Sequence, residues 1–271
     1  MPSYQGRSKA LARTFPDSTL AITYGATNAQ FSGAYAEYAV PLARMMAPNP
    51  KNLDFVEAAS TPIVAVTAWQ LLLEYAQVTR GQTALILGAA GNVGAYAVQL
   101  ASHAGVHVIA VAGAANRQYL TTLGAEGVVD YKTERLEDSL TGVDVVLDTV
   151  GGETQQRALR VLKRGGILVS VLSRVPERLE EQYGVRAAYF YVEVTTARLN
   201  TISELFETGK LVTEVGTVLP LDQASRDARR RAAQAWQDCA EHGVSEAVSI
   251  QSRRMIPRRT ARITASVRSR T

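Results

Sequence analysis

The sequence predicts an α/β protein whose centre is a doubly wound parallel sheet. Three observations carry this prediction. An apolar run at residues 83–87 leads through a glycine-rich turn, Gly88–Gly94, into a segment with helical spacing that ends near Leu100. Beyond it, short apolar runs alternate with amphipathic segments as far as residue 171. The apolar runs lack polar alternation, which is typical of strands buried on both faces of a parallel sheet.

The first 50 residues contain one predicted strand. Residues 1–22 show no periodicity, whereas the alternation at residues 33–40 is typical of a strand. Two aromatic residues in this strand, Tyr35 and Tyr38, either face a substrate or pack against neighbours, and packing is the more common role of strand aromatics.

A capping box marks the start of the next predicted element. Asp54 and Glu57 have the required spacing, so a helix should begin there and continue to Tyr75. Pro62 should kink or divide it, because proline cannot donate the backbone hydrogen bond of a helix interior. On pattern alone, the Thr67 hydroxyl bonds to the backbone of its own helix.

From residue 106 onward, strands and helices are predicted to alternate regularly. Each strand is a short run of β-branched and aliphatic residues, and glycines mark two of the helix ends. The predicted strands occupy residues 106–111, 127–129, 143–147 and 167–171. The predicted helices occupy residues 116–123, 133–140 and 153–162. Right-handed crossovers would make all the strands parallel.

The candidate site lies where the strands end, because an open parallel sheet binds its ligand outside the carboxyl ends of its strands. The segments to inspect are therefore residues 88–94, 112–117, 148–152 and 170–172. The first segment brings backbone amides to the N-terminus of a helix, where the dipole favours a phosphate. Gly94 would let that helix pack closely. We expect Asp148 to be a turn residue bonded to backbone rather than a base.

The loop after the second strand distinguishes two dinucleotides. Sites for NAD usually carry Asp or Glu about 20 residues past the glycines, where the carboxylate binds the ribose 2′-hydroxyl. This chain has Ala112 and Gly113 instead, with Arg117 nearby on the following helix. Because a guanidinium suits a 2′-phosphate, we predict NADPH rather than NADH as the cofactor. The alternative is that Arg117 is only a solvated helix residue.

Composition argues against several other classes of protein. With 46% hydrophobic residues among 271, the chain can bury a full core. No apolar run approaches the roughly 20 residues that cross a bilayer, and the N-terminus has no signal-peptide pattern. We therefore expect a cytoplasmic protein without a membrane partner. A single cysteine, Cys239, and three histidines argue against a disulfide framework or a zinc site.

The net charge of +4 comes from the end of the chain. Residues 226–271 hold 11 arginines and 4 acidic residues, which leaves 18 basic and 21 acidic residues elsewhere. A basic tail can contact nucleic-acid phosphates, but this one lacks interleaved aromatics and any recognition motif. We therefore expect no nucleic-acid partner.

Six short motifs follow one another along the chain: Gly33–Tyr38, Thr67–Trp69, Gly88–Gly94, Leu123–Ala125, Val129–Tyr131 and Asp148–Gly152. In this order and at this spacing they resemble the medium-chain dehydrogenase/reductase superfamily, most closely its zinc-independent quinone oxidoreductase branch. The resemblance covers residues 24–224. It is specific because several motifs agree.

The resemblance implies a Rossmann domain beside a partial GroES-like β domain, and NADPH-dependent transfer of hydride to a quinone or an α,β-unsaturated carbonyl. By matching position, the cofactor pyrophosphate would contact Ala90, Gly91, Asn92 and Val93. The adenosine 2′-phosphate end would contact Gly113, Asn116, Arg117 and Tyr131. The central part would contact Val150 and Ser170. The nicotinamide would lie near Thr67 and residues 190–192, which include Tyr191.

In such an enzyme the cofactor brings the hydride, so the protein aligns the nicotinamide and excludes water. No side chain stands out as a general acid, and the catalytic residues stay unassigned; Tyr35 and Tyr38 are the candidates with a hydroxyl. The resemblance implies no metal, because the Cys and His ligands of zinc alcohol dehydrogenases are absent. It implies a homodimer formed through the edge strand at residues 186–192. The alternative function is a nucleotide-binding fragment or pseudoenzyme that holds NADPH without turnover.

Four segments are expected along the chain. Residues 1–61 form a partial GroES-like substrate domain, 62–212 the NADP-binding Rossmann domain, 213–224 a return segment and 225–271 an aberrant Arg-rich tail. Reading one nucleotide ahead through residues 225–230 permits Ala-Glu-Met-Leu-Ala-Gly. The same frame through residues 233–240 permits a strand like the Gly-Lys-Ile-Val-Leu ending of the family. We therefore expect that a frameshift near Ala224 replaced the C-terminus, and that the substrate domain is shortened.

Overall fold

In a computed structural model of the chain, the residues described are 23–26, 39, 41–216, 218, 220 and 223. The chain divides into two compact units, residues 1–219 and 220–271, and the helices and strands given below belong to the first. The strand predicted at residues 33–40 lies outside the described residues except for Ala39, and so do Tyr35, Tyr38 and the Arg-rich tail.

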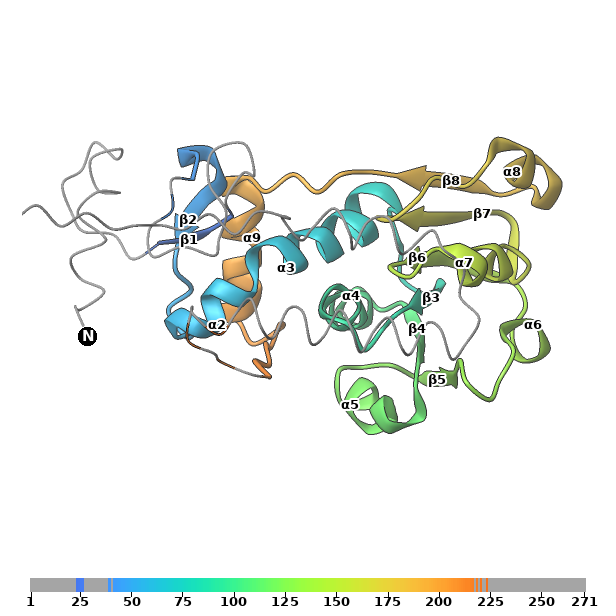
Figure 1. The fold of residues 1–271 in the computed structure, drawn as a ribbon, viewed down its shortest axis with the longest axis horizontal. Coiled ribbons are helices and arrows are strands. Elements are labelled where there is room, and N and C mark those ends of the chain that lie inside the picture. The colour runs from blue at the N-terminus through green and yellow to red at the C-terminus, as the bar shows by residue number, and fades with distance from the viewer. Residues whose placement is uncertain are drawn as a thin grey trace, which may run out of the picture. The chain divides into compact units, whose positions relative to one another are not determined.

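The centre of the first unit is a six-stranded parallel sheet with the strand order β5-β4-β3-β6-β7-β8 (Figure 1). The chain enters at β3, builds outward through β4 and β5, and then returns to add β6, β7 and β8 on the other side. This is the order of a doubly wound sheet with its switch point between β3 and β6, which confirms the predicted fold class. The strands are Thr83–Leu87 (β3), His107–Ala112 (β4), Gly127–Asp130 (β5), Val143–Asp148 (β6), Leu162–Ser170 (β7) and Arg186–Tyr189 (β8).

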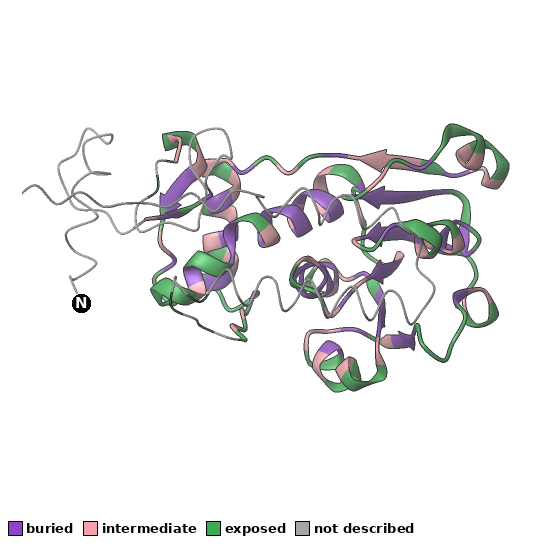
Figure 2. Cartoon of the chain, viewed as in Figure 1, coloured by how far each residue is buried: buried purple, intermediate pink, exposed green. Residues whose placement is uncertain are grey.

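Alternate residues of the strands enter two separate hydrophobic clusters. In β3, Ala84 and Ile86 belong to one cluster, whereas Leu85 and Leu87 belong to the other. Both sets are fully buried, which explains why the strands read as unbroken apolar runs (Figure 2). Helices α4 and α5 cover the first face, and α6, α7 and α8 cover the second. Their bounds are Asn92–His103 (α4), Arg117–Thr122 (α5), Leu136–Ser139 (α6), Gly152–Leu159 (α7) and Glu177–Tyr183 (α8).

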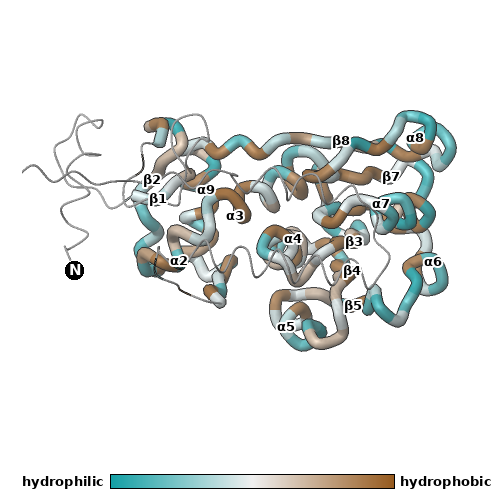
Figure 3. The backbone as a smooth tube through the Cα atoms, viewed as in Figure 1, coloured by the Kyte–Doolittle hydropathy of each residue, from teal (hydrophilic) through white to brown (hydrophobic). Residues whose placement is uncertain are grey.

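A second group of elements surrounds helix α3, which packs against α4 and α9. Helix α3 is apolar along most of its length (Figure 3), as expected for a helix with neighbours on several sides. The group comprises β1 (Thr23–Gly25), η3 (Ala43–Met45), β2 (Met46–Pro48), α2 (Phe55–Ser60), α3 (Pro62–Trp69), the π-helical segment η4 (Gln70–Tyr75) and α9 (Thr196–Glu207).

The predicted capping box and the predicted break at proline are both confirmed. The Asp54 carboxylate accepts hydrogen bonds from the amides of Val56 and Glu57, each at 2.8 Å. The Glu57 carboxylate accepts the Asp54 amide at 2.9 Å. Helix α2 ends at Ser60, and Pro62 begins α3 at a position where its missing N–H costs nothing.

Three predicted boundaries were wrong. The helix expected at residues 133–140 is the single turn Leu136–Ser139, because the Asp130 carboxylate accepts the Lys132 amide and holds the chain before it in a turn. The strand expected from residue 167 begins at Leu162, and a bulge opposite residues 143–145 accommodates the additional length. The helix expected at residues 153–162 ends at Leu159, and Leu162 already belongs to β7. The helical stretch expected to end at Tyr75 does end there, although its last six residues widen into a π-helix.

Candidate functional site

One transverse row of residues marks the point where the strands of the sheet end. From β5 to β8 the residues paired in register are Val129, Val111, Leu87, Asp148, Ser170 and Tyr189. Four of the predicted site residues lie two positions past this row, each after a different strand: Tyr131, Gly113, Val150 and Tyr191. The sheet therefore brings them to one edge, because the carboxyl ends of parallel strands meet there.

The turn from β3 into α4 is so tight that its glycines cannot be replaced without movement. Gly88 has φ +71°, in the left-handed region that favours glycine. A Cβ on Gly94 would lie 2.6 Å from the Cα of Ala89 and closer still to the Gly88 carbonyl oxygen. A Cβ on Gly91 would lie 3.2 Å from that same oxygen. The turn thus presents main chain rather than side chains at the switch point of the sheet.

The helix after this turn begins without a side-chain cap. Gly91 is the N-cap residue, and no side chain among the described residues accepts from the amides of the first turn. Gly91 and Asn92 are exposed, and Ala90 and Val93 are half-buried. The positive end of a 12-residue helix therefore faces outward at the four positions predicted to contact a pyrophosphate.

At the carboxyl end of β6, a buried carboxylate organises the neighbouring loop. Asp148 accepts the main-chain amides of Val150 and Gly151 at 2.9 and 2.8 Å on one oxygen. Its other oxygen accepts the Gln155 amide nitrogen and the Ser170 hydroxyl, each at 2.8 Å. Asp148 is therefore a turn residue bonded to backbone, as its position predicts, and both of its oxygens are engaged inside the protein.

Ser170 and Val150 present different surfaces to the predicted cofactor. Ser170 is fully buried, and its hydroxyl accepts the amides of Leu172 and Ser173 at 3.1 and 3.3 Å besides donating to Asp148. A cofactor contact at this position would fall to its main chain. Val150 is exposed, and its Cγ2 would lie 3.0 Å from a Cβ on Gly88. Val150 therefore borders the glycine turn directly.

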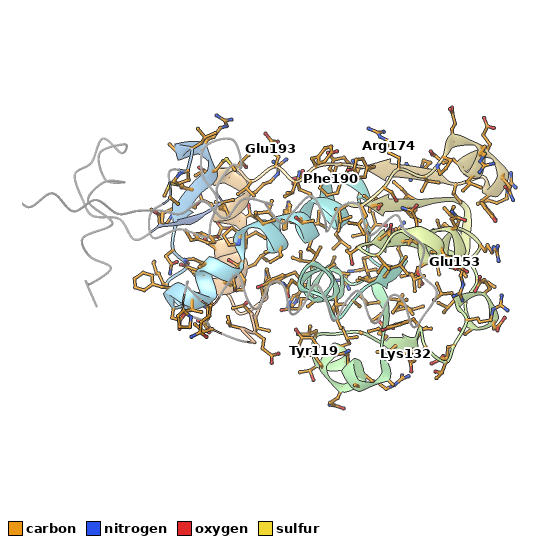
Figure 4. All side chains as sticks on the ribbon, in the orientation of Figure 1. Tyr119, Lys132, Glu153, Arg174, Phe190 and Glu193 are labelled. Atoms are coloured by element: carbon orange, nitrogen blue, oxygen red, sulfur yellow. The ribbon has the colours of Figure 1, made fainter. Side chains whose placement is uncertain are left out.

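The carboxyl ends of β4 and β5 carry exposed and charged side chains. A Cβ on Gly113 would lie 3.9 Å from Cε1 of Tyr131. The Lys132 ammonium lies 5.9 Å from the centroid of the Tyr131 ring; Figure 4 labels Lys132. Arg117 Nη2 lies 3.9 Å from Glu134 Oε1, with 54% of the Arg117 side chain exposed. Such an exposed pair stabilises the fold little, so the arginine can turn to a ligand at small cost.

Asn116 contributes to this region through the backbone. It ends the short turn η5 (Ala114–Asn116), and its amide donates to the Gly113 carbonyl at 2.9 Å. This turn brings the first residue of α5, Arg117, back toward the end of β4. The structure thus gathers the residues predicted at the adenosine end, although their contacts with a cofactor stay predictions.

The two positions predicted at the nicotinamide lie on separate elements. Thr67 is buried in α3, and its hydroxyl donates to the Ile63 carbonyl at 2.6 Å, the backbone bond predicted from the pattern. Tyr191 is 83% exposed in the segment after β8. Gln70, three residues past Thr67, accepts the amide of Glu193 at 2.9 Å, two residues past Tyr191. A hydrogen bond therefore joins the two elements beside the predicted positions.

Sequence reasoning missed Lys132 and Gln155. Lys132 directly follows Tyr131, so its charge could have been noticed as a second cation beside the loop of Arg117. Gln155 gives no comparable signal, because its role depends on α7 bringing it back to Asp148. Only the three-dimensional packing of α7 reveals it.

The described part of the chain offers neither a metal centre nor a membrane-spanning element. No three His, Cys, Asp or Glu side chains within it are grouped so that they could hold a metal ion. No helix within it combines the length and apolar character needed to cross a bilayer. The candidate general acids, Tyr35 and Tyr38, lie outside the described ranges.

Comparisons with known proteins agree with this geometry. Residues 123–238 match a family model described as zinc-binding dehydrogenase. A probable zinc-binding mitochondrial oxidoreductase of Arthroderma benhamiae is 31% identical over 210 residues, which make up 71% of this chain and 63% of the relative. An NADPH-dependent alkenal/one oxidoreductase of Arabidopsis thaliana chloroplasts is 34% identical over 145 residues, or 53% of this chain and 37% of the relative.

A solved structure, the quinone oxidoreductase from Coxiella burnetii, is similar with a TM-score of 0.69 and 32% identity, and the likeness covers 74% of this chain and 64% of that one. The chain spans less than two thirds of the length of these relatives. Sheet order, the glycine turn at the switch point and these likenesses lead to one assignment. The chain belongs to the medium-chain dehydrogenase/reductase superfamily, in its quinone-oxidoreductase-like branch.

Proposed function

We propose that this chain binds NADPH along the carboxyl edge of its sheet and serves in the transfer of hydride to a quinone or an α,β-unsaturated carbonyl. One observation carries the proposal: the uncapped N-terminus of α4 follows a glycine turn at the switch point of a doubly wound sheet. In such sheets a dinucleotide crosses this point with its pyrophosphate on the helix N-terminus.

The glycine turn fits a pyrophosphate. A Cβ on Gly91 or Gly94 would crowd or collide with the turn itself, and a Cβ on Gly88 would collide with the Thr149 side chain, so these positions leave the backbone free to approach a phosphate closely. Ala90 to Val93 would place their amides around it. The two phosphate charges would be stabilised by the helix dipole rather than by a side chain.

The choice of NADPH over NADH is supported by the open end of the sheet. Ala112 and Gly113 provide no carboxylate to bind a ribose 2′-hydroxyl. Arg117 and Lys132 provide two cations there. Glu134 opposes them, but its 3.9 Å pair with Arg117 is exposed and a dianionic phosphate would compete with it effectively.

The acceptor class is supported by the relatives, whose names include an alkenal/one oxidoreductase and a quinone oxidoreductase. Bound NADPH would supply the hydride from its nicotinamide ring. The task of the chain would be to orient that ring and to exclude water. Tyr191, exposed two positions past the end of β8, and the main chain of Ser170, the last residue of β7, would serve this task. No proton donor is assigned to the product.

Nucleotide titration tests the cofactor part of this proposal. We expect NADPH to bind at least about tenfold more tightly than NADH, because the 2′-phosphate gains charged contacts. Gly94→Ala should lower NADPH affinity by about 100-fold, since the turn must shift. Gly127→Ala is the matched control, because a Cβ there would meet Ile109 at an ordinary 3.9 Å. Failure of the wild-type chain to bind either nucleotide would overturn the proposal.

Turnover is tested separately, by following NADPH oxidation with a panel of quinones and enones. Oxidation that depends on the acceptor supports the reductase. Binding without oxidation by any acceptor would instead support the alternative, a nucleotide-binding protein without turnover.

A homodimer through the edge strand is the remaining part of the proposal. Strand β8 pairs with β7 on one side and ends the sheet on the other, so its outer edge can add a strand from a second copy. Sedimentation at several concentrations would detect the dimer. The Ala187 amide points to this outer edge, where it donates to the Glu180 carboxylate at 2.9 Å. Ala187→Pro removes that main-chain donor without removing one that pairs with β7, and is expected to weaken the dimer if this edge forms it.

A further inference from the structure

The segment between β8 and α9, residues 190–195, is the part of the predicted nicotinamide end that has no regular secondary structure. It leaves the sheet just past Tyr189, at the end of the transverse row, and carries the exposed Tyr191. A loop of this kind gains mobility unless side chains from elsewhere hold its backbone. The contacts of this segment therefore decide how firmly Tyr191 is placed.

Three side chains of the π-helical segment η4 contact this loop or Arg198, the arginine that also bonds to it. The Tyr75 ring stacks on Phe190 with 4.2 Å between centroids and 13° between planes. Gln70 accepts the Glu193 amide at 2.9 Å and donates to Glu74 at 3.1 Å. Figure 4 shows Phe190 and Glu193 along the connection from β8 to α9. Irregular π turns of this type are frequent at functional sites.

Arg198, in the first turn of α9, completes the arrangement. Its Nε and Nη2 donate to the two carboxylate oxygens of Glu74, each at 2.8 Å, in a planar fork. Its Nη1 donates to the Glu193 carbonyl at 2.8 Å and to the Glu193 carboxylate at 3.1 Å. The hydrogen bond from Arg198 also lowers the pKa of Glu74, which keeps the carboxylate charged. The guanidinium thus bonds η4 and the loop backbone at once.

We propose that Arg198 is a positioning residue: anchored on Glu74, it fixes the backbone at Glu193 and thereby holds Tyr191 at the nicotinamide end of the cofactor. The inference rests on the proposed binding of NADPH. It assigns no contact between Arg198 and the cofactor. The structure carries it because both main-chain groups of Glu193 are bonded to side chains, the amide to Gln70 and the carbonyl to Arg198.

A pair of ligands separates positioning from general stability. NADPH reaches from the adenosine end to the nicotinamide end, whereas 2′-phospho-ADP-ribose shares its adenosine, pyrophosphate and phosphate but lacks the nicotinamide. Arg198→Lys keeps the charge and loses the fork. We expect it to raise the Kd of NADPH by about tenfold and to change the Kd of 2′-phospho-ADP-ribose by less than about twofold.

Arg157→Lys is the matched control. Arg157 forms the same kind of fork with Glu137, at 3.1 and 2.9 Å, between helices α7 and α6 and away from the loop. The Arg157→Lys variant should bind NADPH and 2′-phospho-ADP-ribose with unchanged affinities. Gln70→Leu is the second variant. It removes the acceptor of the Glu193 amide and the Gln70–Glu74 hydrogen bond but keeps every hydrogen-bond partner of Arg198. It should also raise the Kd of NADPH selectively, and it tests the inference if Arg198→Lys does not fold.

Each outcome of these titrations either supports or overturns the positioning role of Arg198. Selective weakening of NADPH by Arg198→Lys or Gln70→Leu, with the control silent, supports the inference. Equal weakening of both ligands, or no change in either, would overturn it while leaving the proposed function in place. If the wild-type chain binds neither ligand, the proposed function itself fails.

Discussion

Two regions of the transverse row, one at β6 and β7 and the other at β4 and β5, differ in how their polar groups are used. At β6 and β7, the Asp148 carboxylate is buried and accepts four hydrogen bonds from within the protein. At β4 and β5, Arg117 and Lys132 are exposed, and the Arg117 guanidinium lies 3.9 Å from the Glu134 carboxylate. The polar groups of the first region hold the loop backbone in place, whereas those of the second are exposed cations that a ligand can contact. Substitutions in the two regions should therefore affect different measurements, stability in the first and ligand affinity in the second.

The largest effect is expected from Asp148→Ala. It would leave two amides, one side-chain amide and one hydroxyl without their buried acceptor, and should lower the free energy of unfolding by about 3 kcal/mol. Urea unfolding measures this. The exposed Asp138→Ala is the control and should change the free energy by less than about 0.5 kcal/mol. Similar unfolding midpoints for the two variants would remove the distinction between the regions.

Arg117→Ala tests the region at β4 and β5. It should weaken NADPH binding by about tenfold, or about 1.4 kcal/mol, and leave NADH binding and unfolding unchanged. Isothermal titration with both nucleotides tests this. Arg178→Ala, an equal loss of charge from an exposed position in α8, is the control. A matching loss of NADH affinity would show that Arg117 does not read the 2′-phosphate.

The ion pair between Glu137 and Arg157 joins α6, which follows β5, to α7, which follows β6, and so connects the two regions. The Arg157 guanidinium lowers the pKa of Glu137 from 4.5 to about 2. Because the folded pKa is depressed, the pair stabilises the fold above pH 4.5, and this stabilisation is lost as pH falls from 4.5 toward 2.

We expect Glu137→Gln to lower the free energy of unfolding at pH 7 by about 1 kcal/mol, with allowance for solvent screening. The difference between wild type and variant should shrink as the pH falls toward 2. Unfolding curves at several pH values measure it. A difference independent of pH would mean that the carboxylate charge contributes nothing, and that packing alone explains the effect.

The smallest effect is expected from Glu134→Gln. It removes the charge that competes for Arg117, and its amide oxygen can still accept the Asp130 amide as Glu134 does at 3.1 Å. NADPH affinity should rise by about twofold at low salt, and the gain should fade at high salt. Weaker NADPH binding in this variant would instead show that Glu134 orients Arg117 toward the ligand.

Much of the fold could be predicted because local signals agreed with the global arrangement. The apolar run before Gly88 and the helical spacing after Gly94 predict β3 and α4, and the Asp54–Glu57 pair predicts the start of α2. That the strands are parallel could be expected from the alternation of strands and helices and from the handedness of crossovers, whereas their order in the sheet comes from the structure. Boundaries were less accurate where side chains bond nearby backbone, as at Asp130.

The candidate site was predictable only in part. Residues after a strand, such as Gly113 and Tyr131, follow from the order of the sheet. The hydrogen bonds of Gln155 and Arg198 do not, because they join segments 7 and 124 residues apart through packing that no local pattern encodes. The widening of the helix at Gln70 likewise has no signal in the residues themselves.

The transverse row has a consequence for how this fold can vary. A residue gained or lost within a strand would turn the apolar side chains of that strand to the opposite face, so the core fixes the number of residues ahead of the row. Past the row no such constraint applies, and each strand ends in its own loop. The loops past the row can therefore change one at a time, and ligand preference with them, while the strands and their pairing stay the same.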